Sequence, residues 1–175
     1  MDSGMADWKD RYKKWVEESM DDWRAGKRKQ VLENYPFMVF EDTPWAPFSG
    51  KASDHTFALI TSGGLYMQGK QDPFETESIH GDPSFREIPK GVKQKEIGIA
   101  HPFYDHCFVE KDINCILPIN HFIELEKEGV IGRLAKTHYS FTYVNNIIPL
   151  VEQAAPEIIK RLKHEAVDAL FLVPV

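Results

Sequence analysis

The chain has 175 residues, of which 42% are apolar and 27% are charged, and its formal net charge is −6. A mildly acidic chain without a block of lysine and arginine argues against a nucleic-acid-binding protein. The charged N-terminus lacks the apolar core of a signal peptide, and no apolar run is long enough to cross a membrane. Two cysteines without a CxxC pair indicate a reduced, cytoplasmic protein with no disulfide framework.

Residues 1–54 are predicted to form a helix and an extended segment that pack on the rest of the chain. Trp8, Tyr12 and Trp15 recur at helical spacing among charged residues, which predicts an amphipathic helix over 5–23. Residues 35–47 carry three prolines and several aromatic side chains, which favours an extended segment. The aromatic stripe needs a partner surface in this chain or in a second copy, so a homo-oligomer is one expectation.

Residues 55–175 are predicted to form a single α/β domain. Strands are expected over 56–61, 96–100 and 114–118, and the last apolar run, 168–175, predicts a buried strand. Helices are expected over 121–128, ended by Gly129, and over 146–164, where the interior Pro156 should kink or split the helix. Strands joined by helices predict a mostly parallel, doubly wound sheet with flanking helices, in addition to the N-terminal amphipathic helix.

Polar and glycine residues follow the first predicted strand. The pair Gly63-Gly64 after Ser62 allows positive φ and close backbone approach, so free N–H groups there could face an anion such as a carboxylate. The alternative is a tight turn with no ligand. The pair fits neither a dinucleotide fingerprint nor a P-loop.

Two histidines, a tyrosine and an aspartate gather between residues 101 and 107. If this segment enters a helix, His101 and Asp105 lie on one face, as an acid–base pair or as part of a metal site with His138 as a third ligand. A hydrogen-bonded structural cluster is the alternative. Cys107 beside His106 is a candidate nucleophile with a lowered pKa, whereas Cys115, in an apolar run, is expected to be an inert core thiol.

Arg86 follows a turn-rich stretch and is a candidate clamp for a substrate carboxylate. Its planar guanidinium can bind a carboxylate through two parallel hydrogen bonds, with Asp82 orienting it. An ion pair inside the loop is the alternative.

These segments occur in a characteristic order, and together they carry a resemblance. The chain resembles the selenoprotein B family of the glycine, sarcosine, betaine and D-proline reductases, in its short, D-proline-reductase-like form. The resemblance covers about residues 57–175. It rests on Thr61-Ser62-Gly63-Gly64-Leu65, Gly81-Asp82-Pro83-Ser84-Phe85-Arg86-Glu87-Ile88, His101-Pro102-Phe103-Tyr104-Asp105-His106, Asn114-Cys115-Ile116-Leu117-Pro118-Ile119, Ile131-Gly132-Arg133-Leu134-Ala135, His138-Tyr139-Ser140-Phe141 and Leu172-Val173-Pro174-Val175.

The resemblance implies a reductase with a selenocysteine or cysteine nucleophile. In the family, the nucleophile lies in a short motif with a nearby cysteine, after the strand matching Leu172-Val173-Pro174-Val175. It attacks the carbon bearing an amine, the C–N bond is cleaved reductively with electrons from dithiols, and partner subunits can supply a pyruvoyl group. The motif is absent from these 175 residues, as when a selenocysteine UGA codon is read as a stop. We therefore expect the nucleophile just after Val175 and no reductase activity from these residues alone.

The predicted function is thus a reductase component that acts on a small amine, amino acid or betaine, with a partner reductase subunit or dithiol donor and no cofactor in these residues. His101, Asp105 and His106 are the predicted catalytic residues, with proton transfer by a histidine that Asp105 orients. The competing functions are a non-catalytic small-molecule-binding α/β domain and a metal-dependent hydrolase that uses His101, Asp105 and His106. The Gly63-Gly64 turn is expected to approach His101, because adjacent parallel strands end at one edge of a sheet. The substrate pocket should be lined by Ser62, Gly63, Gly64, Arg86, Tyr104 and His138 beside the catalytic residues.

Overall fold

The computed structural model describes residues 2–39 and 46–175, and the chain forms two compact units, residues 1–48 and 49–175. Part of the predicted extended segment, residues 40–45, lies outside the described residues.

The first unit contains the predicted amphipathic helix. Helix α1 (Asp2–Arg24) is followed by the short helix α2 (Arg28–Glu33). The Trp8 indole donates to the carbonyl of Pro36 (2.7 Å), and the Trp15 indole donates to the carbonyl of Val31 (3.2 Å). The aromatic stripe therefore finds a packing surface inside its own unit.

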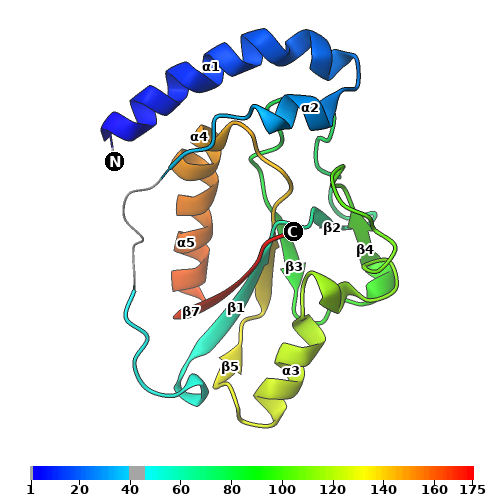
Figure 1. Cartoon of the computed structure of the whole chain (residues 1–175). Coiled ribbons are helices and arrows are strands. Elements are labelled where there is room, and N and C mark those ends of the chain that lie inside the picture. The colour runs from blue at the N-terminus through cyan, green and yellow to red at the C-terminus, as the bar shows by residue number, and fades with distance from the viewer. Residues whose placement is uncertain (1, 40–45) are drawn as a thin grey trace. The chain divides into compact units, whose positions relative to one another are not determined.

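A five-stranded, mostly parallel sheet organises the second unit (Figure 1). The central strand β1 (Thr56–Thr61) pairs in parallel with β5 (Arg133–Leu134) near its start and with β6 (Thr137–Ser140) near its end. On its other side, β1 pairs in parallel with β7 (Ala169–Val173) along its length. Strand β3 (Arg86–Pro89) joins β6 in antiparallel fashion at the far edge. The predicted mixed α/β fold with a mostly parallel sheet is confirmed.

The predicted second strand lies in a different sheet from the one expected. Strand β4 (Ile97–Ile99), preceded by the 3₁₀ helix η2 (Gln94–Glu96), pairs in antiparallel fashion with β2 (Leu65–Met67) in a separate two-stranded sheet. It is therefore not a parallel neighbour of β1. Another 3₁₀ helix, η1 (Ala52–Asp54), precedes β1.

The predicted strand over 114–118 is wrong. Residues Ile113–Cys115 form the 3₁₀ helix η3, because the Asp112 carboxylate accepts a hydrogen bond from the backbone N–H of Asn114 (2.9 Å) and caps a helical turn. Ile116 and Leu117, which follow that turn, are buried, and helix α3 (Ile119–Lys127) begins two residues later.

The predicted ends and breaks of the helices are confirmed. Gly129 follows α3 with a φ of +72°, a value that glycine adopts readily at a helix C-terminus. The long C-terminal helix is split into α4 (Ile147–Pro149), a π-helical turn over Leu150–Ala154, and α5 (Ala155–His164). Pro156 lies in the first turn of α5, directly after the π-helical turn, so the irregular turns lie next to the proline as predicted.

Helices cover both faces of the central strand (Figure 1). On one face, Leu59 belongs to a core with Phe122 of α3, and on the other, Ala58 packs with Ile158 and Leu162 of α5. Burying a side chain such as Leu59 contributes about 1.5–3 kcal/mol. The sheet is therefore held between two apolar layers around β1.

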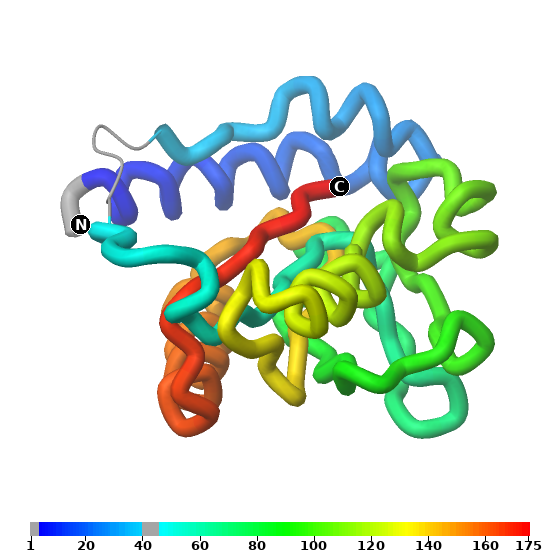
Figure 2. Tube along the Cα trace, turned by 90° about the horizontal axis from the view of Figure 1, so that it is seen from below, coloured from blue at the N-terminus to red at the C-terminus, as the bar shows by residue number. Residues whose placement is uncertain are grey.

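The last strand is not buried, in contrast to the prediction. Leu170, Phe171 and Leu172 are 46%, 43% and 64% exposed, although Ala169 is buried. The physical reason is position: in the described part of the chain, β7 has a strand neighbour on one side only, which is β1. Figure 2, viewed from below, shows α3 and α5 together on one side of the red β7 trace.

Candidate functional site

The turn after β1 lies directly against His101. Gly64 has a φ of +69°, and its carbonyl accepts a hydrogen bond from the backbone N–H of Ala100 (2.8 Å). A Cβ atom at Gly64 would lie 2.5 Å from the Ala100 carbonyl oxygen and 2.9 Å from the His101 Cβ, so only glycine fits. The expected approach of the glycine turn to His101 is confirmed. Its predicted reason is wrong, since the antiparallel pairing of β2 with β4 brings them together.

The N–H groups of this turn already have acceptors within the chain. Gly63 donates to the Thr61 hydroxyl (3.1 Å), and Gly64 donates to the Phe141 carbonyl (2.7 Å). Leu65 donates to the Ser140 hydroxyl (2.7 Å). The predicted free N–H groups for an anion are therefore not present, and the geometry matches the alternative of a tight turn.

His101 is nearly buried and is surrounded by aromatic rings. Its ring lies 5.0 Å from the ring of Tyr104, 6.0 Å from that of Phe103 and 6.2 Å from that of Tyr143. The backbone N–H of Phe103 donates to Nδ1 of His101 (3.3 Å), so the neutral ring carries its proton on Nε2. Burial, and to a lesser extent the neighbouring His106, lowers the pKa of His101 to about 4. The ring is therefore neutral near pH 7.

Tyr104 and His106 complete a cluster around the glycine turn. The Tyr104 hydroxyl donates to the Gly63 carbonyl (2.8 Å), and burial raises the pKa of Tyr104 to about 12. Nε2 of His106 lies 2.8 Å from the His101 carbonyl, which can only accept, so this nitrogen donates. We call these five residues the turn cluster: Gly63, Gly64, His101, Tyr104 and His106.

The Asp105 side chain engages Cys107. The segment 101–107 is not helical, and the exposed Asp105 carboxylate accepts a hydrogen bond from the backbone N–H of Cys107 (2.9 Å). The predicted pairing of His101 with Asp105 on a helix face is therefore wrong. Hydrogen bonds from Cys107 lower the pKa of Asp105, and the same carboxylate raises the pKa of Cys107. Cys107 is thus held as a thiol, contrary to the expected lowered pKa.

Cys115 is exposed, which contradicts its predicted burial in a core strand. It lies in η3, whose buried residue is Ile113, and Ile116 and Leu117 are buried just after it. The error has the same origin as the wrong strand over 114–118: in the helical turn, Cys115 lies on the exposed side.

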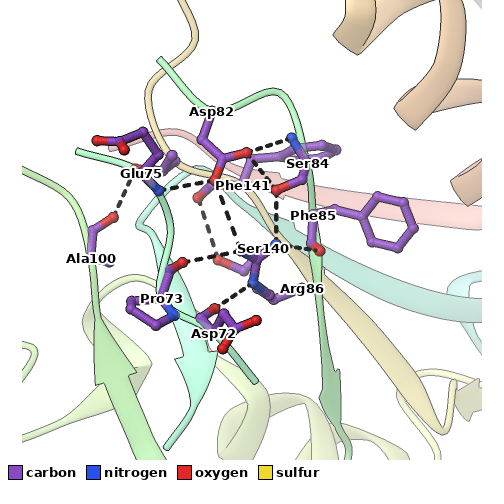
Figure 3. A network of polar contacts seen from close by, with 11 residues as sticks. Asp72, Pro73, Glu75, Asp82, Ser84, Phe85, Arg86, Ala100, Ser140 and Phe141 are labelled. Carbon is purple, nitrogen blue, oxygen red and sulfur yellow. Dashed lines mark hydrogen bonds and ion pairs between the residues drawn. The ribbon is translucent and has the colours of Figure 1, made fainter. Parts of the chain in front are cut away.

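Arg86 is fully engaged by its own loop (Figure 3). Its guanidinium donates to the carbonyls of Asp72 (2.8 Å) and Pro73 (3.2 Å) and to the hydroxyl of Ser84 (2.8 Å), and it stacks over the ring of Phe74. These contacts match the alternative of an internal loop network, because a ligand carboxylate would have to displace them.

Asp82 belongs to the same loop network. Its carboxylate lies 3.8 Å from Arg86 and accepts hydrogen bonds from the backbone N–H groups of Ser84 (2.9 Å) and Glu75 (3.0 Å). Burial alone would raise the pKa of Asp82, but the hydrogen bonds from Ser84 and Glu75 together with Arg86 lower it. The carboxylate is thus a charged acceptor that holds the loop together.

His138 lies in the core rather than in the turn cluster. It is completely buried in β6, where its Nδ1 accepts a hydrogen bond from the backbone N–H of Leu59 (3.1 Å). Its Nε2 has no hydrogen-bond partner among the described residues, and burial lowers its pKa to about 4. Across residues 2–39 and 46–175, no three His, Cys, Asp or Glu side chains are grouped so that they could hold a metal ion. The metal-dependent hydrolase therefore has no ligand set in this part of the chain.

The end of β7 lies beside the turn cluster. The backbone N–H of Ser62 donates to the Val173 carbonyl (3.2 Å), and the backbone N–H of Val175 donates to the Ser62 hydroxyl (2.9 Å). The segment after β7 is therefore tied to the turn that carries Gly63 and Gly64. Ser62 is the predicted site residue that makes this connection.

Two neighbours of the cluster were not predicted from the sequence. The buried Thr142 hydroxyl donates to the Ala100 carbonyl (2.8 Å), and Tyr143 packs against Phe103. The signal available was their position just after the motif at 138–141.

A cavity of about 590 Å³ borders one side of the cluster at His106. The other residues that line it come from the two-stranded sheet and its flanks: Tyr66, Gln68, Gln94, Lys95, Ile97, Gly98, Ile99 and Glu110. Of the predicted site residues, His106 lines this cavity and the others do not, so the predicted residues do not share one pocket.

The sequence profile of the glycine/sarcosine/betaine reductase selenoprotein B family matches residues 27–174. This chain belongs to that family. No solved structure gives a significant match to it. The predicted membership, and with it the description as a component of the oxidoreductase family, is confirmed.

Relatives of this selenoprotein B family chain include subunits of several reductases. It is 36% identical over 129 residues to D-proline reductase subunit gamma of Acetoanaerobium sticklandii, a match that covers 73% of this chain and 52% of the relative. It is 31% identical over 151 residues to glycine reductase complex component B subunit gamma of Symbiobacterium thermophilum, covering 85% and 35%. The chain thus spans about half the length of the first relative and about a third of the second.

A third relative carries a different substrate in its name. The sarcosine reductase complex component B subunit beta of Peptoclostridium acidaminophilum is 29% identical over 140 residues, covering 79% of this chain and 32% of the relative. The relatives are subunits of multi-component complexes. Within the described residues, no helix is both long and apolar enough to cross a membrane.

Proposed function

We propose that this chain forms the substrate-facing half of a reductase that cleaves a C–N bond in a small amine, amino acid or betaine. One observation carries the proposal: the hydrogen bond from Val175 N–H to the Ser62 hydroxyl ties the segment after β7 to the turn cluster. In the family, the nucleophile follows the strand that matches β7. A nucleophile there would start beside Ser62 and Gly63, at the carboxyl end of a parallel strand, where ligands bind in open α/β sheets.

The proposed reaction consumes one dithiol for each substrate. A selenolate or thiolate placed just after Val175 attacks the carbon that bears the amine, so a C–Se or C–S bond forms as the C–N bond breaks and the amine leaves with a proton. One thiol of the dithiol then attacks the selenium or sulfur, and the substrate carbon leaves and takes a proton to give C–H. The second thiol displaces the nucleophile and closes the disulfide, so the dithiol supplies two electrons and two protons overall. A partner subunit or a separate dithiol donor supplies these electrons, and a pyruvoyl group in a partner can activate the amine.

The residues of the turn cluster have different roles in the proposed reaction. His101, neutral because of its lowered pKa, is a poor base near pH 7 but can donate a hydrogen bond from Nε2. His106, at the border of the cavity, is the better placed histidine for proton transfer. Tyr104 holds the turn through the Gly63 carbonyl and positions the substrate side of the cluster. Asp105 has no part in orienting His101.

The first test is the nucleotide sequence of the gene. The codon after Val175 should be UGA or a cysteine codon, with another cysteine codon within a few residues. A different residue there, with no cysteine nearby, would contradict the placement of the nucleophile.

The second test is catalytic. The 175-residue chain and a longer form that carries the cysteine or selenocysteine are incubated with a dithiol and D-proline, glycine, sarcosine or betaine, and the released amine or ring-opened product is measured. We expect turnover by the longer form alone, and its loss when the nucleophile is replaced by serine. Ordinary turnover by the 175-residue chain would mean that the nucleophile is misplaced, and Cys107 would be the first residue to replace. Binding without turnover by the longer form would favour the non-catalytic module.

A further inference from the structure

Strand β7 presents an open edge of the main sheet. It pairs with β1 from Phe57↔Ala169 to Thr61↔Val173, in parallel and without interruption. In the described part of the chain, no strand pairs with its opposite edge. Every second N–H and C=O group of β7 therefore points away from the sheet, ready to pair with another strand.

The side chains of β7 are more apolar than those of a typical sheet edge that faces water. The strand reads Ala-Leu-Phe-Leu-Val, with no charge, bulge or proline inside it, although natural sheet edges usually carry such features. Leu172 is 64% exposed, and its two neighbours Leu170 and Phe171 are nearly half exposed. A strand that is apolar on both faces is typical of the interior of a parallel sheet, where helices cover both faces.

The helices of this unit leave that apolar surface incompletely covered. Phe171 shares its face with Leu59 and contacts Phe122 of α3 at 5.0 Å between ring centroids. Leu170 and Leu172 lie beside Ala58 and Ile60, on the face that α5 covers, and stay exposed. The sheet therefore lacks both a neighbouring strand and the helical cover that would accompany it.

A second copy of this chain is a poor occupant for the edge. Two β7 strands related by a two-fold axis would pair antiparallel and satisfy the backbone. Each copy would bring only its own α3 and α5, which already pack on its own β1 and leave β7 half exposed. The apolar side chains would thus remain in contact with water on both faces.

We propose that the outer edge of β7 docks a further β-strand with its covering helix, from the polypeptide that corresponds to the part of D-proline reductase subunit gamma that this chain does not match. The match covers 52% of that relative, so nearly half of a related chain lies outside it. A βα unit would supply the strand and the helix at once. The proposal rests on family membership and on the geometry of β7, not on the proposed chemistry.

The test is co-expression of the tagged 175-residue chain with the unmatched part of the Acetoanaerobium sticklandii D-proline reductase subunit gamma. We expect the two polypeptides to purify together at a one-to-one ratio. Leu172→Lys should weaken the complex at least about tenfold, since a charge would be buried at the joined edge. Val130→Lys is the matched control, because Val130 is 49% exposed outside the sheet, and it should leave the complex intact.

Each contrary outcome overturns the proposal. A dimer of the 175-residue chain that Leu172→Lys dissociates would identify a second copy as the occupant. A complex that tolerates Leu172→Lys would place the contact elsewhere. A single polypeptide that joins the two parts gives a second measurement: amide exchange of residues 169–173 should slow at least about tenfold relative to the 175-residue chain. Unchanged exchange, or a monomer without a complex, would mean that the edge stays open.

Discussion

At one edge of the main sheet, β3 is covered by the loop that precedes it, whereas at the other edge β7 lies open. The side chain of Gln71 donates to the outer carbonyl of Glu87 (3.0 Å), and Arg86 holds the carbonyls of Asp72 and Pro73. Strand β3 also ends at Pro89, which has no N–H to offer. Nothing comparable covers β7 in the described residues. The edge at β3 is thus covered by residues of this chain, whereas the edge at β7 has the composition of an interior strand.

Charge separates the two edges in the same way. Glu87 of β3 forms an ion pair with Arg161 of α5, and Arg161 stacks over Phe85. Strand β7 carries no charged residue between Ala169 and Val173. Because charges at an edge oppose association with another strand, β3 is protected and β7 is not. Four predictions test this contrast, in order of decreasing effect.

The largest effect is expected at the closed edge. Arg86→Leu removes the hydrogen bonds to Asp72, Pro73 and Ser84 and leaves the carboxylate of Asp82, 13% exposed, without its cation, so the free energy of unfolding should fall by about 3 kcal/mol. Urea denaturation measures the change. Arg161→Leu is the control: this side chain is 43% exposed against 15% for Arg86, and its loss should cost at most about 1 kcal/mol. Equal effects would argue against a special role for the Arg86 network.

The acid sensitivity of the closed edge depends on Asp82. Its pKa is lowered in the folded state, so its contribution is complete above the ordinary aspartate pKa of about 4 and is lost as the pH falls through the lower folded value. Asp82→Asn should cost about 1–2 kcal/mol near pH 7, and this difference should shrink below about pH 4. Urea midpoints of both proteins against pH provide the measurement. A difference that stays constant down to low pH would contradict the linkage.

A smaller effect is expected from Gln71. Gln71→Ala leaves the outer Glu87 carbonyl without its side-chain donor and should reduce the free energy of unfolding by about 1 kcal/mol. Gln68→Ala, at an exposed position three residues earlier, should change it by less than about 0.5 kcal/mol. If both substitutions are neutral in urea denaturation, the cover over β3 does not depend on Gln71.

The smallest effect on folding is expected at the open edge. In the isolated 175-residue chain, Leu172→Lys should change the free energy of unfolding by no more than about 0.5 kcal/mol, because Leu172 is 64% exposed. Thermal unfolding of this variant beside Val130→Lys measures it. A loss as large as that of Arg86→Leu would mean that Leu172 is already buried in the isolated chain.

Much of the local structure follows from the sequence alone. Apolar periodicity determined β1 and the helices α1, α3 and α5, because alternation and helical spacing are properties of neighbouring residues. Gly129 and Pro156 marked a helix end and a helix break through their backbone geometry. The glycine pair at 63–64 also indicated a close approach of backbone segments, which Gly64 makes against His101.

Tertiary structure decided the rest, for reasons that act at long range. The apolar run at 113–117 became a helical turn because Asp112 caps it, and short apolar runs fit a strand or a helix equally well. Arg86 binds backbone carbonyls of residues 72 and 73, and His138 binds the N–H of Leu59. Backbone C=O and N–H groups occur in nearly every residue, so side-chain identity gives no signal for these partners. The exposure of β7 depends on how many strands flank it, a property of the whole sheet that its five apolar residues cannot encode.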